Sequence, residues 1–290
     1  MTLIELVEHA STELERAGVA YGHGTANAFD EAAWLVLWRL DLPLDGLDEH
    51  AERVLTDAEV AAVNALIAQR ISTRKPAAYL TGEAWLQGVA FTVDERVIVP
   101  RSLIAEPLMD GTLDVWLSED TRRVLDLCTG NGSLAVLAAL AWPEVQVRAT
   151  DISADAVAVA TLNVQRHGLQ DRITLAVGDG LAAAPGTYDL ILCNPPYVNR
   201  DSMKLLPPEF LAEPALALDG NVHGGNDGMD FVRDLLRNVA RRLNEDGVLV
   251  LEIGNEREHF EKAFPRLLPV WLSTSAGDDQ VMLLTREQLA

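Results

Sequence analysis

Hydrophobic residues in the first part of the chain recur every three or four positions, which is the spacing of an amphipathic helix. Three stretches show this spacing, at 3–14, 29–40 and 60–70. Thr2 and Thr56 each stand three residues before a glutamate, so both can form the capping box that marks the start of a helix. The pattern predicts a small helical domain.

The pattern changes to short apolar runs between turn residues after Pro76. Turn signals stand at Gly88 and at 94–95. Because the runs are too short and too interrupted for helices, we expect a β-ribbon that links two domains. Its expected segments are 79–82, 85–86, 91–93 and 97–100.

From about residue 122 onward, strand-like and helix-like patterns alternate. This alternation is typical of a parallel β-sheet with crossover helices, an α/β fold. The last two apolar runs have no helical pattern between them and predict a terminal hairpin. The expected strands are 124–128, 145–150, 173–177, 190–193, 248–253, 270–272 and 281–284, and the expected helices are 133–141, 154–167 and 230–243.

Asn194, Pro195, Pro196 and Tyr197 directly follow the apolar run 190–193. Each proline fixes φ and lacks an N–H group, so the strand ends here and nearby carbonyl groups stay free for a ligand. Ligands of open α/β sheets bind beyond the carboxyl ends of the strands. The Asn194 side-chain oxygen and the Pro195 carbonyl can accept both hydrogens of a planar NH2 group, on which Tyr197 stacks. A strand-ending turn capped by Asn194 is the alternative.

A glycine turn joins the first predicted strand to its helix. Gly130 and Gly132 allow a tight turn and close approach to a ligand, and the following helix presents its first N–H groups. Asp126 precedes the turn, where its carboxylate would repel a pyrophosphate but can hold an ammonium group. The three-glycine dinucleotide fingerprint is absent. The cofactor-binding residues predicted here are Asp126, Cys128, Thr129, Gly130, Asn131 and Gly132.

Two further acids end the second and third predicted strands. Asp151 occupies the position where a carboxylate binds both ribose hydroxyls in this class of sheet. Asp179 can accept a hydrogen bond from an adenine amino group. With Asp126 they predict a pocket for an amino acid, a ribose and an adenine, and therefore for S-adenosylmethionine. Each acid alone also fits a helix cap or a solvated loop. The predicted cofactor site also includes Ile152, Gly180, Leu181 and Asn194.

The charge of the chain narrows the class of partner. The 290 residues include 44 acidic and 23 basic side chains, for a net charge of −21. Because affinity for duplex nucleic acid comes mainly from neutralised phosphates, this charge argues against duplex DNA as a partner. It would attract a basic protein. A host that favours acidic proteins explains the charge equally well.

The termini and the cysteines indicate the compartment. The first residues have no basic segment followed by an apolar run, so they do not predict a secretory signal, and the longest apolar stretch, 134–142, is far short of a membrane span. Cys128 and Cys193 each end a predicted strand without metal-ligand spacing. We therefore expect reduced thiols, no metal and a cytoplasmic location.

The glycine turn at 126–132 and the motif at 194–197 together resemble the HemK-type protein N(5)-glutamine methyltransferases. The resemblance covers essentially the whole chain. It implies a class I S-adenosylmethionine-dependent methyltransferase fold, a Rossmann-like seven-stranded sheet, with S-adenosylhomocysteine as product. Gly180 departs from the family by replacing a bulkier residue that packs on the adenine. The implied domains are a helical substrate-recognition domain at 1–75, a β-ribbon linker at 76–100 and the methyltransferase domain at 101–290.

Within this family the stretches 79–82, 93–96 and 99–102 are more similar to the PrmB branch, which acts on ribosomal protein L three, than to the release-factor branch. The resemblance implies methylation of a glutamine side-chain amide in that basic protein, either free or on a ribosome precursor. It makes 194–197 the catalytic motif. Arg101 and Glu106 are further candidates for substrate binding, with a plain ion pair between domains as the alternative.

Two other functional classes stay open at this point. A nucleic-acid amino-group methyltransferase would present the same planar NH2 group, but it would need an exposed base and a positively charged track. A non-catalytic assembly factor could use the same fold. An eroded glycine turn or a lost Asn194 would favour that second class, and the sequence keeps both features.

Overall fold

A computed structural model describes residues 1–290, and these residues form two units. Unit 1 comprises Met1–Ala84 and Leu206–Glu213, and unit 2 comprises Trp85–Leu205 and Pro214–Ala290. Unit 1 has its own hydrophobic core, and unit 2 has one core on each face of its sheet. None of the helices combines the length and the apolar character that a membrane crossing requires.

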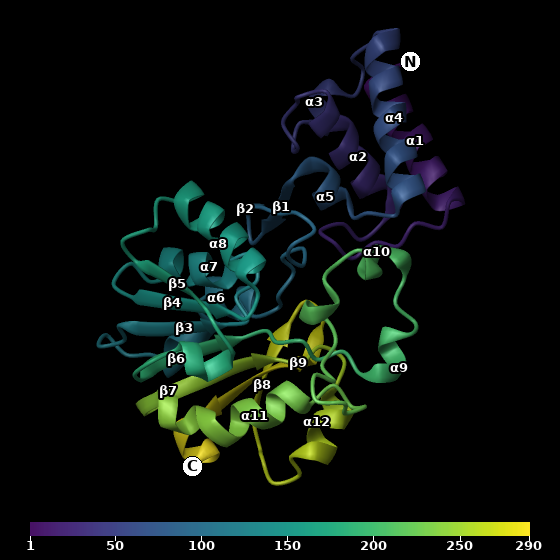
Figure 1. Cartoon of the computed structure of the whole chain (residues 1–290). Helices are drawn as coiled ribbons and strands as arrows, with labels where there is room; N and C mark the ends of the chain where they lie inside the picture. The colour runs from purple at the N-terminus through teal and green to yellow at the C-terminus, as the bar shows by residue number, and fades with distance from the viewer. The chain divides into compact units, whose positions relative to one another are not determined.

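Unit 1 contains the three predicted helices, α1 (Leu3–Arg16), α2 (Ala28–Arg39) and α4 (Asp57–Thr73) (Figure 1). Both predicted capping boxes form, because Thr2 and Thr56 each exchange hydrogen bonds with the glutamate three residues later. The apolar faces of the three helices meet in one buried core. The short helices of this unit are α3 (Leu47–His50), α5 (Ala77–Thr81) and α10 (Pro208–Leu211).

A buried ionic network ties α10 into unit 1. Arg70 donates through Nε to Glu31 Oε1 at 2.8 Å, and its Nη1 lies 3.4 Å from Glu209 Oε1. Arg74 Nε lies 2.7 Å from the same Glu209 oxygen. The Glu209 side chain is fully buried, and these two arginines are its ion-pair partners. The segment 206–213 is therefore part of the core of unit 1, although it lies far along the chain.

The predicted β-ribbon forms only in part. β1 (Glu83–Leu86) and β2 (Val89–Thr92) pair around the predicted turn at Gly88. The expected segment 79–82 is wrong, because residues 77–81 form helix α5, which Gly82 ends in the left-handed conformation. The expected strand 97–100 is also wrong. Residues 97–100 pair with no strand, although the side chains of Val97 and Val99 are buried.

Seven strands form one sheet in unit 2, in the order β5-β4-β3-β6-β7-β9-β8. The strands from β5 to β7 are parallel to one another, and β9 is antiparallel to both of its neighbours. This confirms the predicted α/β sheet and its terminal hairpin. The strands are β3 (Arg123–Leu127), β4 (Gln146–Asp151), β5 (Ile173–Val177), β6 (Tyr188–Cys193), β7 (Leu243–Glu252), β8 (Val270–Thr274) and β9 (Gly277–Thr285).

Alternating side chains of this sheet build the two cores. On β3, Val124 belongs to the core on one face of the sheet, and Leu125 belongs to the core on the opposite face. Successive residues of a strand point to opposite faces, so helices cover both sides (Figure 1). These helices are α6 (Ala105–Met109), α7 (Ser133–Ala141), α8 (Ala154–Arg166), α11 (Asp230–Asn238) and α12 (Arg257–Ala263).

Short helical segments fill several connections of unit 2. The helix expected over 230–243 is α-helical only to Asn238, continues as a 3-10 helix to Arg242, and Leu243 begins β7. The segment 198–228 contains several short helices. The remaining elements are η1 (Thr112–Trp116), η2 (Gly180–Ala183), α9 (Arg200–Met203), η3 (Ala215–Ala217), η4 (Val239–Arg242) and α13 (Arg286–Leu289).

Candidate functional site

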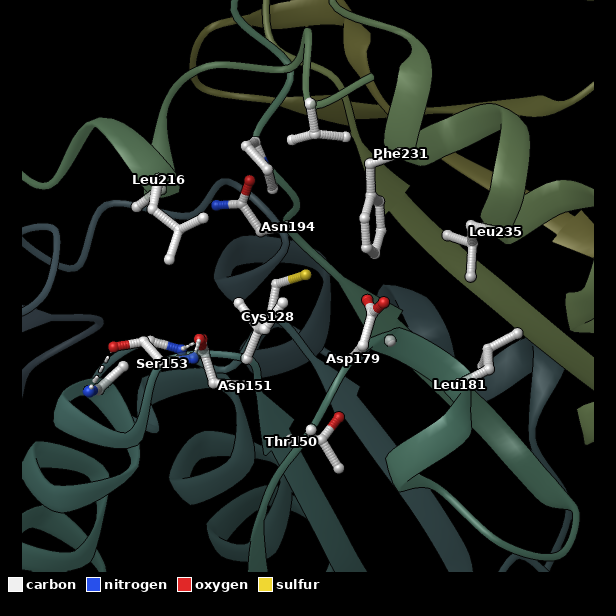
Figure 2. Close-up of a pocket in the computed structure, with 18 of the residues that line it drawn as sticks. Cys128, Thr150, Asp151, Ser153, Asp179, Leu181, Asn194, Leu216, Phe231 and Leu235 are labelled. Atoms are coloured by element: carbon white, nitrogen blue, oxygen red, sulfur yellow. Dashed lines mark hydrogen bonds between the residues drawn. The ribbon is translucent and has the colours of Figure 1, made fainter.

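A cavity of about 810 Å³ lies in unit 2, at the carboxyl ends of four parallel strands (Figure 2). This volume is within the usual range of small-molecule sites, roughly 300–1,000 Å³. The ends of β3, β4, β5 and β6 each contribute to its wall. The predicted residues that line it are Cys128, Gly130, Asp151, Ile152, Asp179, Gly180, Leu181, Asn194 and Pro196.

The glycine turn after β3 has the backbone shape that the sequence predicts. Gly130 has a φ of +55°, and a Cβ added there would meet nothing within 4 Å. Gly132 has a φ of +81°, and an added Cβ would lie 3.1 Å from the Ala160 Cβ, so α8 packs directly on the turn. The Thr129 N–H donates to the Thr150 carbonyl at 3.0 Å, which fixes the turn to β4.

Asp126 lies behind the turn and is buried. Its Oδ2 accepts hydrogen bonds from the Thr129 hydroxyl and from the Ala135 N–H, the latter at 3.0 Å. Its Oδ1 is buried and has no hydrogen-bond partner. Burial raises the pKa of Asp126 to about 7, and the nearby charge of Asp151 raises it further. An unpartnered buried carboxylate oxygen fits a cationic group such as an ammonium.

Asp151 ends β4 and faces the cavity in Figure 2. Its Oδ1 accepts from the Ser153 N–H and its Oδ2 from the Gly130 N–H, both at 2.9 Å. Burial raises the pKa of Asp151, although these backbone donors oppose the shift. Each carboxylate oxygen has a second lone pair, so the group can still accept two ligand hydroxyls. The hydroxyl of Thr150 beside it is buried without a partner.

The far end of the cavity combines one acid with an apolar wall. Asp179 is exposed at the end of β5, and Leu181, Phe231 and Leu235 lie around it in Figure 2. A Cβ added to Gly180 would lie 3.9 Å from the Phe231 ring. Phe231 therefore lies next to Gly180, the position at which the family has a bulkier residue.

Sequence reasoning missed part of the lining. Phe231 and Leu235 are four residues apart and lie on one face of α11, which is the signal that could have indicated them. Thr150 directly precedes the predicted Asp151. The missed lining residues labelled in Figure 2 are Thr150, Ser153, Leu216, Phe231 and Leu235.

The motif after β6 divides between the cavity and the core. The Asn194 side chain points into the cavity in Figure 2, and no hydrogen bond joins it to another residue. Pro196 also lines the cavity, whereas Pro195 is buried and does not. Tyr197 packs against the hydrophobic core, and its hydroxyl donates to Glu252 Oε1 at 3.2 Å.

The two candidate substrate-binding residues lie outside the cavity wall. Arg101 donates through Nη1 to the Val99 carbonyl at 3.1 Å, and it is one of the charges that act on the Tyr197 hydroxyl. Glu106 accepts from the N–H and the hydroxyl of Ser275, at 2.6 and 2.5 Å. Glu106 therefore joins α6 to the turn between β8 and β9.

Three features of the cavity wall, and one of the buried turn behind it, fit S-adenosylmethionine. The unpartnered Asp126 oxygen suits the ammonium of an amino acid, and Asp151 keeps acceptor capacity for a diol. The wall of Leu181, Phe231 and Leu235 suits an aromatic ring. The open space at Gly130 leaves room for a ligand next to the backbone. The residues present therefore fit the group that the sequence predicts.

Two family models match separate parts of the chain. Residues 111–223 match the methyltransferase small domain, and residues 5–82 match the PrmC N-terminal domain. The first range contains the glycine turn, Asp151, Asp179 and Asn194. The second covers most of unit 1.

Curated relatives match over nearly their whole length. The chain is 55% identical over 291 aligned residues to the ribosomal protein uL3 glutamine methyltransferase of Bordetella pertussis strain Tohama I, covering 99% of this chain and 96% of that protein. It is 50% identical to the protein of the same name from Burkholderia pseudomallei strain K96243, covering 99% of this chain and 95% of that protein.

A solved structure supports the fold alone. The hMettl16 catalytic domain in complex with the MAT2A 3'UTR hairpin 6 has a TM-score of 0.50 and 15% sequence identity, covering 79% of this chain and 81% of that chain.

Proposed function

Because the chain belongs to the family of ribosomal protein uL3 glutamine methyltransferases, we propose that it transfers a methyl group from S-adenosylmethionine to the side-chain amide nitrogen of a glutamine in uL3. One structural observation carries the proposal. Asn194, which no other side chain or backbone group engages, points into a cavity whose wall also holds Asp151 and the glycine turn. The cofactor leaves as S-adenosylhomocysteine.

The cofactor would be held by three strand ends. Asp126 would bind its ammonium group, Asp151 its ribose hydroxyls and Asp179 its adenine amino group. Phe231 and Leu181 would contact the faces of the adenine ring. When bound, S-adenosylmethionine supplies an electrophilic methyl group carried on a sulfonium.

The motif would make a poor nucleophile reactive by holding it. An amide nitrogen is weakly nucleophilic, because its lone pair is delocalised into the carbonyl. Asn194 Oδ1 and the Pro195 carbonyl oxygen accept the two amide hydrogens, which orients the nitrogen and stabilises the positive charge that develops on it. No strong base is required, because the N–H proton becomes far more acidic once the new N–C bond forms and is then lost to water. Tyr197, one side of which contacts the hydrophobic core, would pack its other side against the plane of the amide.

The rest of the chain would recognise the protein that carries the glutamine. We assign substrate recognition to the helical residues 1–75, a linking role to 76–100 and the chemistry to 101–290. In this proposal Arg101 and Glu106 would contact the protein substrate outside the cofactor cavity. The net charge of −21 favours a basic ribosomal protein, free or on a ribosome precursor, and a substrate of the translation apparatus would place the reaction in the cytoplasm.

The direct test is Asn194→Ala in an assay that follows a radiolabelled methyl group from S-adenosylmethionine into purified uL3. Loss of one preorganised hydrogen-bond partner is expected to lower kcat by about 100-fold to 1,000-fold. The exposed Asn226 provides a matched control, since Asn226→Ala removes the same group outside the cavity. Retention of wild-type turnover by Asn194→Ala would remove the proposed role.

The acceptor is tested separately from the motif. Wild-type enzyme is incubated with uL3, with a peptide-chain release factor and with deproteinised ribosomal RNA, and peptide mass spectrometry locates the label. Label on a glutamine of uL3 is expected. Label on the release factor alone would move the chain to that substrate, and label on RNA alone would make it a nucleic-acid methyltransferase.

A further inference from the structure

One buried carboxylate joins three separate segments at the edge of the proposed active site. Glu252 ends β7 and is 3% exposed. Its Oε2 accepts from the Ser102 hydroxyl at 2.6 Å, from the Leu103 N–H at 2.9 Å and from the Ile104 N–H at 3.4 Å. Its Oε1 accepts from the Tyr197 hydroxyl at 3.2 Å. Glu252 therefore links β7, the segment after Arg101 and the catalytic motif.

The turn after β7 is shaped to receive the motif. Gly254 has a φ of +51°, and a Cβ added there would lie 2.6 Å from Tyr197 Cε2, so the ring lies directly on the glycine. Glu256 Oε1 accepts from the Asn199 N–H at 3.2 Å and from the Asn199 side-chain amide at 2.7 Å. Residues 252–256 thus hold both Tyr197 and Asn199.

The motif needs such support because its own backbone provides little. The pairing of β6 with its neighbours ends at Cys193, and Pro195 and Pro196 have no N–H group to donate. The position of the Asn194 and Pro195 oxygens therefore depends on how the residues that follow are anchored. The hydroxyl of Tyr197 is the first polar side-chain contact after the prolines.

The Tyr197 hydroxyl and the Glu252 carboxylate have fixed roles as hydrogen-bond donor and acceptor. Burial raises the pKa of the Tyr197 hydroxyl, and the adjacent Glu252 raises it further, so the hydroxyl stays protonated and donates. Burial also raises the pKa of Glu252, but its four donors oppose that shift. Neither Tyr197 nor Glu252 lines the cavity, so their contact lies inside the protein.

We propose that Glu252 is a positioning residue for methyl transfer, which acts through the Tyr197 hydroxyl to set where the Asn194 and Pro195 oxygens hold the acceptor amide. This inference rests on the proposed function of the motif. A displacement of about 1 Å in a reacting geometry can lower a rate about 100-fold, so a contact remote from the methyl group can still control turnover.

A double-mutant cycle tests the pathway from Glu252 to the motif. Tyr197→Phe keeps the ring on Gly254 and removes only the hydroxyl, and Glu252→Met removes both oxygens at similar volume. Each is expected to lower kcat about 10-fold to 100-fold with the KM for uL3 and the Kd for S-adenosylmethionine within about twofold of wild type. The double variant is expected to be no slower than Glu252→Met, because both changes break one contact.

Two further variants separate positioning from folding. Glu252→Gln keeps an acceptor for residues 102–104 but turns an amide N–H toward the tyrosine, so that the hydroxyl must accept rather than donate, and the variant is expected to recover only part of the rate. If Glu252→Met does not fold, the same cycle is run with Glu252→Gln, and a coupling of the same sign is expected. Glu258→Gln, on the exposed side of α12, is the matched control and should keep the wild-type kcat.

Three results would overturn the proposal. Additive losses from Tyr197→Phe and the Glu252 variant would mean that the hydroxyl acts without Glu252. A fall in kcat matched by an equal fall in the number of S-adenosylmethionine sites would mean loss of folded protein only. Unchanged kcat in Tyr197→Phe would remove the contact from catalysis.

Amide hydrogen exchange distinguishes failure of this inference from failure of the proposed function. Exchange of the amides at 103–104 and 197–199 is expected to be faster in the Glu252 variant than in wild type, whatever protein accepts the methyl group. Unchanged exchange would contradict the positioning role even if uL3 is methylated. Faster exchange with no labelling of uL3 would instead leave the positioning role standing and remove the assigned substrate.

Discussion

The substitution Asp126→Asn tests whether the buried acid behind the glycine turn is tuned by its surroundings to bind a cation. Asparagine keeps the shape of the side chain. Its oxygen can accept from the Thr129 hydroxyl and the Ala135 N–H as Asp126 Oδ2 does, and its amide group takes the place of the unpartnered Oδ1. The substitution therefore removes a charge and leaves the packing in place.

The stability change follows from the pKa of about 7, against an ordinary value of 3.8. The folded protein binds the proton more tightly than the unfolded chain, so this group lowers stability as the pH rises from about 4 to about 7. The resulting loss in the free energy of unfolding is roughly 4 kcal/mol above pH 7 and is absent below pH 4. Asp126→Asn is thus expected to raise Tm at pH 8, by at most roughly 8–16 °C for a unit of this size, and to leave it unchanged near pH 4.

The same shift predicts the pH dependence of cofactor affinity. We assume that the ammonium binds only when Asp126 is ionised. The fraction of protein with ionised Asp126 rises from about 3% at pH 5.5 to about 50% at pH 7, which gives about a 15-fold gain in affinity for S-adenosylmethionine. An α-amino group stays largely protonated in this range. Asp151 also has a raised pKa and titrates in both proteins, so the difference between wild type and Asp126→Asn isolates Asp126.

Calorimetry with S-adenosylmethionine at pH 5.5 and 7 and thermal melting at pH 4 and 8 provide the two measurements. The exposed Asp120→Asn is the matched control, and 5′-methylthioadenosine, which lacks the ammonium, should show no contribution from Asp126. The reasoning would be refuted if the affinity ratio between wild type and Asp126→Asn were the same at both pH values, or if the variant were less stable than wild type at pH 8.

Three further outcomes are expected. Asp151→Asn, which converts one acceptor oxygen into a donor at the proposed ribose site, should weaken S-adenosylmethionine binding about 10-fold or more by calorimetry, whereas the exposed Asp155→Asn should not. Glu209→Gln should lower the free energy of unfolding by about 3–5 kcal/mol in urea titrations, because two arginines lose a fully buried partner, with the exposed Glu52→Gln as control. The kcat/KM for uL3 should fall with added salt while the Kd for S-adenosylmethionine changes less, since screening acts on the long-range attraction of the net charge of −21 for a basic protein.

The sequence predicts the strand ends well because their signals are local. The apolar runs that end at Leu127 and Cys193 are followed by the glycine turn and the proline pair, and the parallel order of the strands brings these ends to one edge with the end of β4 at Asp151. The capping boxes of α1 and α4 are likewise read within four residues. Neither prediction needs information from distant parts of the chain.

Contacts between distant residues explain what the sequence does not reveal. Glu31, Arg70 and Glu209 form one network, although 39 residues separate the first two and 139 separate the last two. Glu252 reaches Ser102 across 150 residues. Each of these residues, read alone, is an ordinary charged or polar residue of a helix, strand or loop, so nothing in its neighbourhood indicates a buried partner.

The polar groups that would bind the cofactor are also the ones that destabilise the protein without it. Asp126 has a buried oxygen without a partner, and the Thr150 hydroxyl nearby is buried and unpartnered too. Each unpaired buried group costs about 1–3 kcal/mol, and more when it is charged. The Thr129 hydroxyl and the Ala135 N–H hold Asp126 through its other oxygen, and the hydrogen bond from the Thr129 N–H to the Thr150 carbonyl fixes the backbone of Thr150. A ligand with an ammonium and hydroxyl groups in the right places would then gain affinity from groups that are already desolvated and oriented.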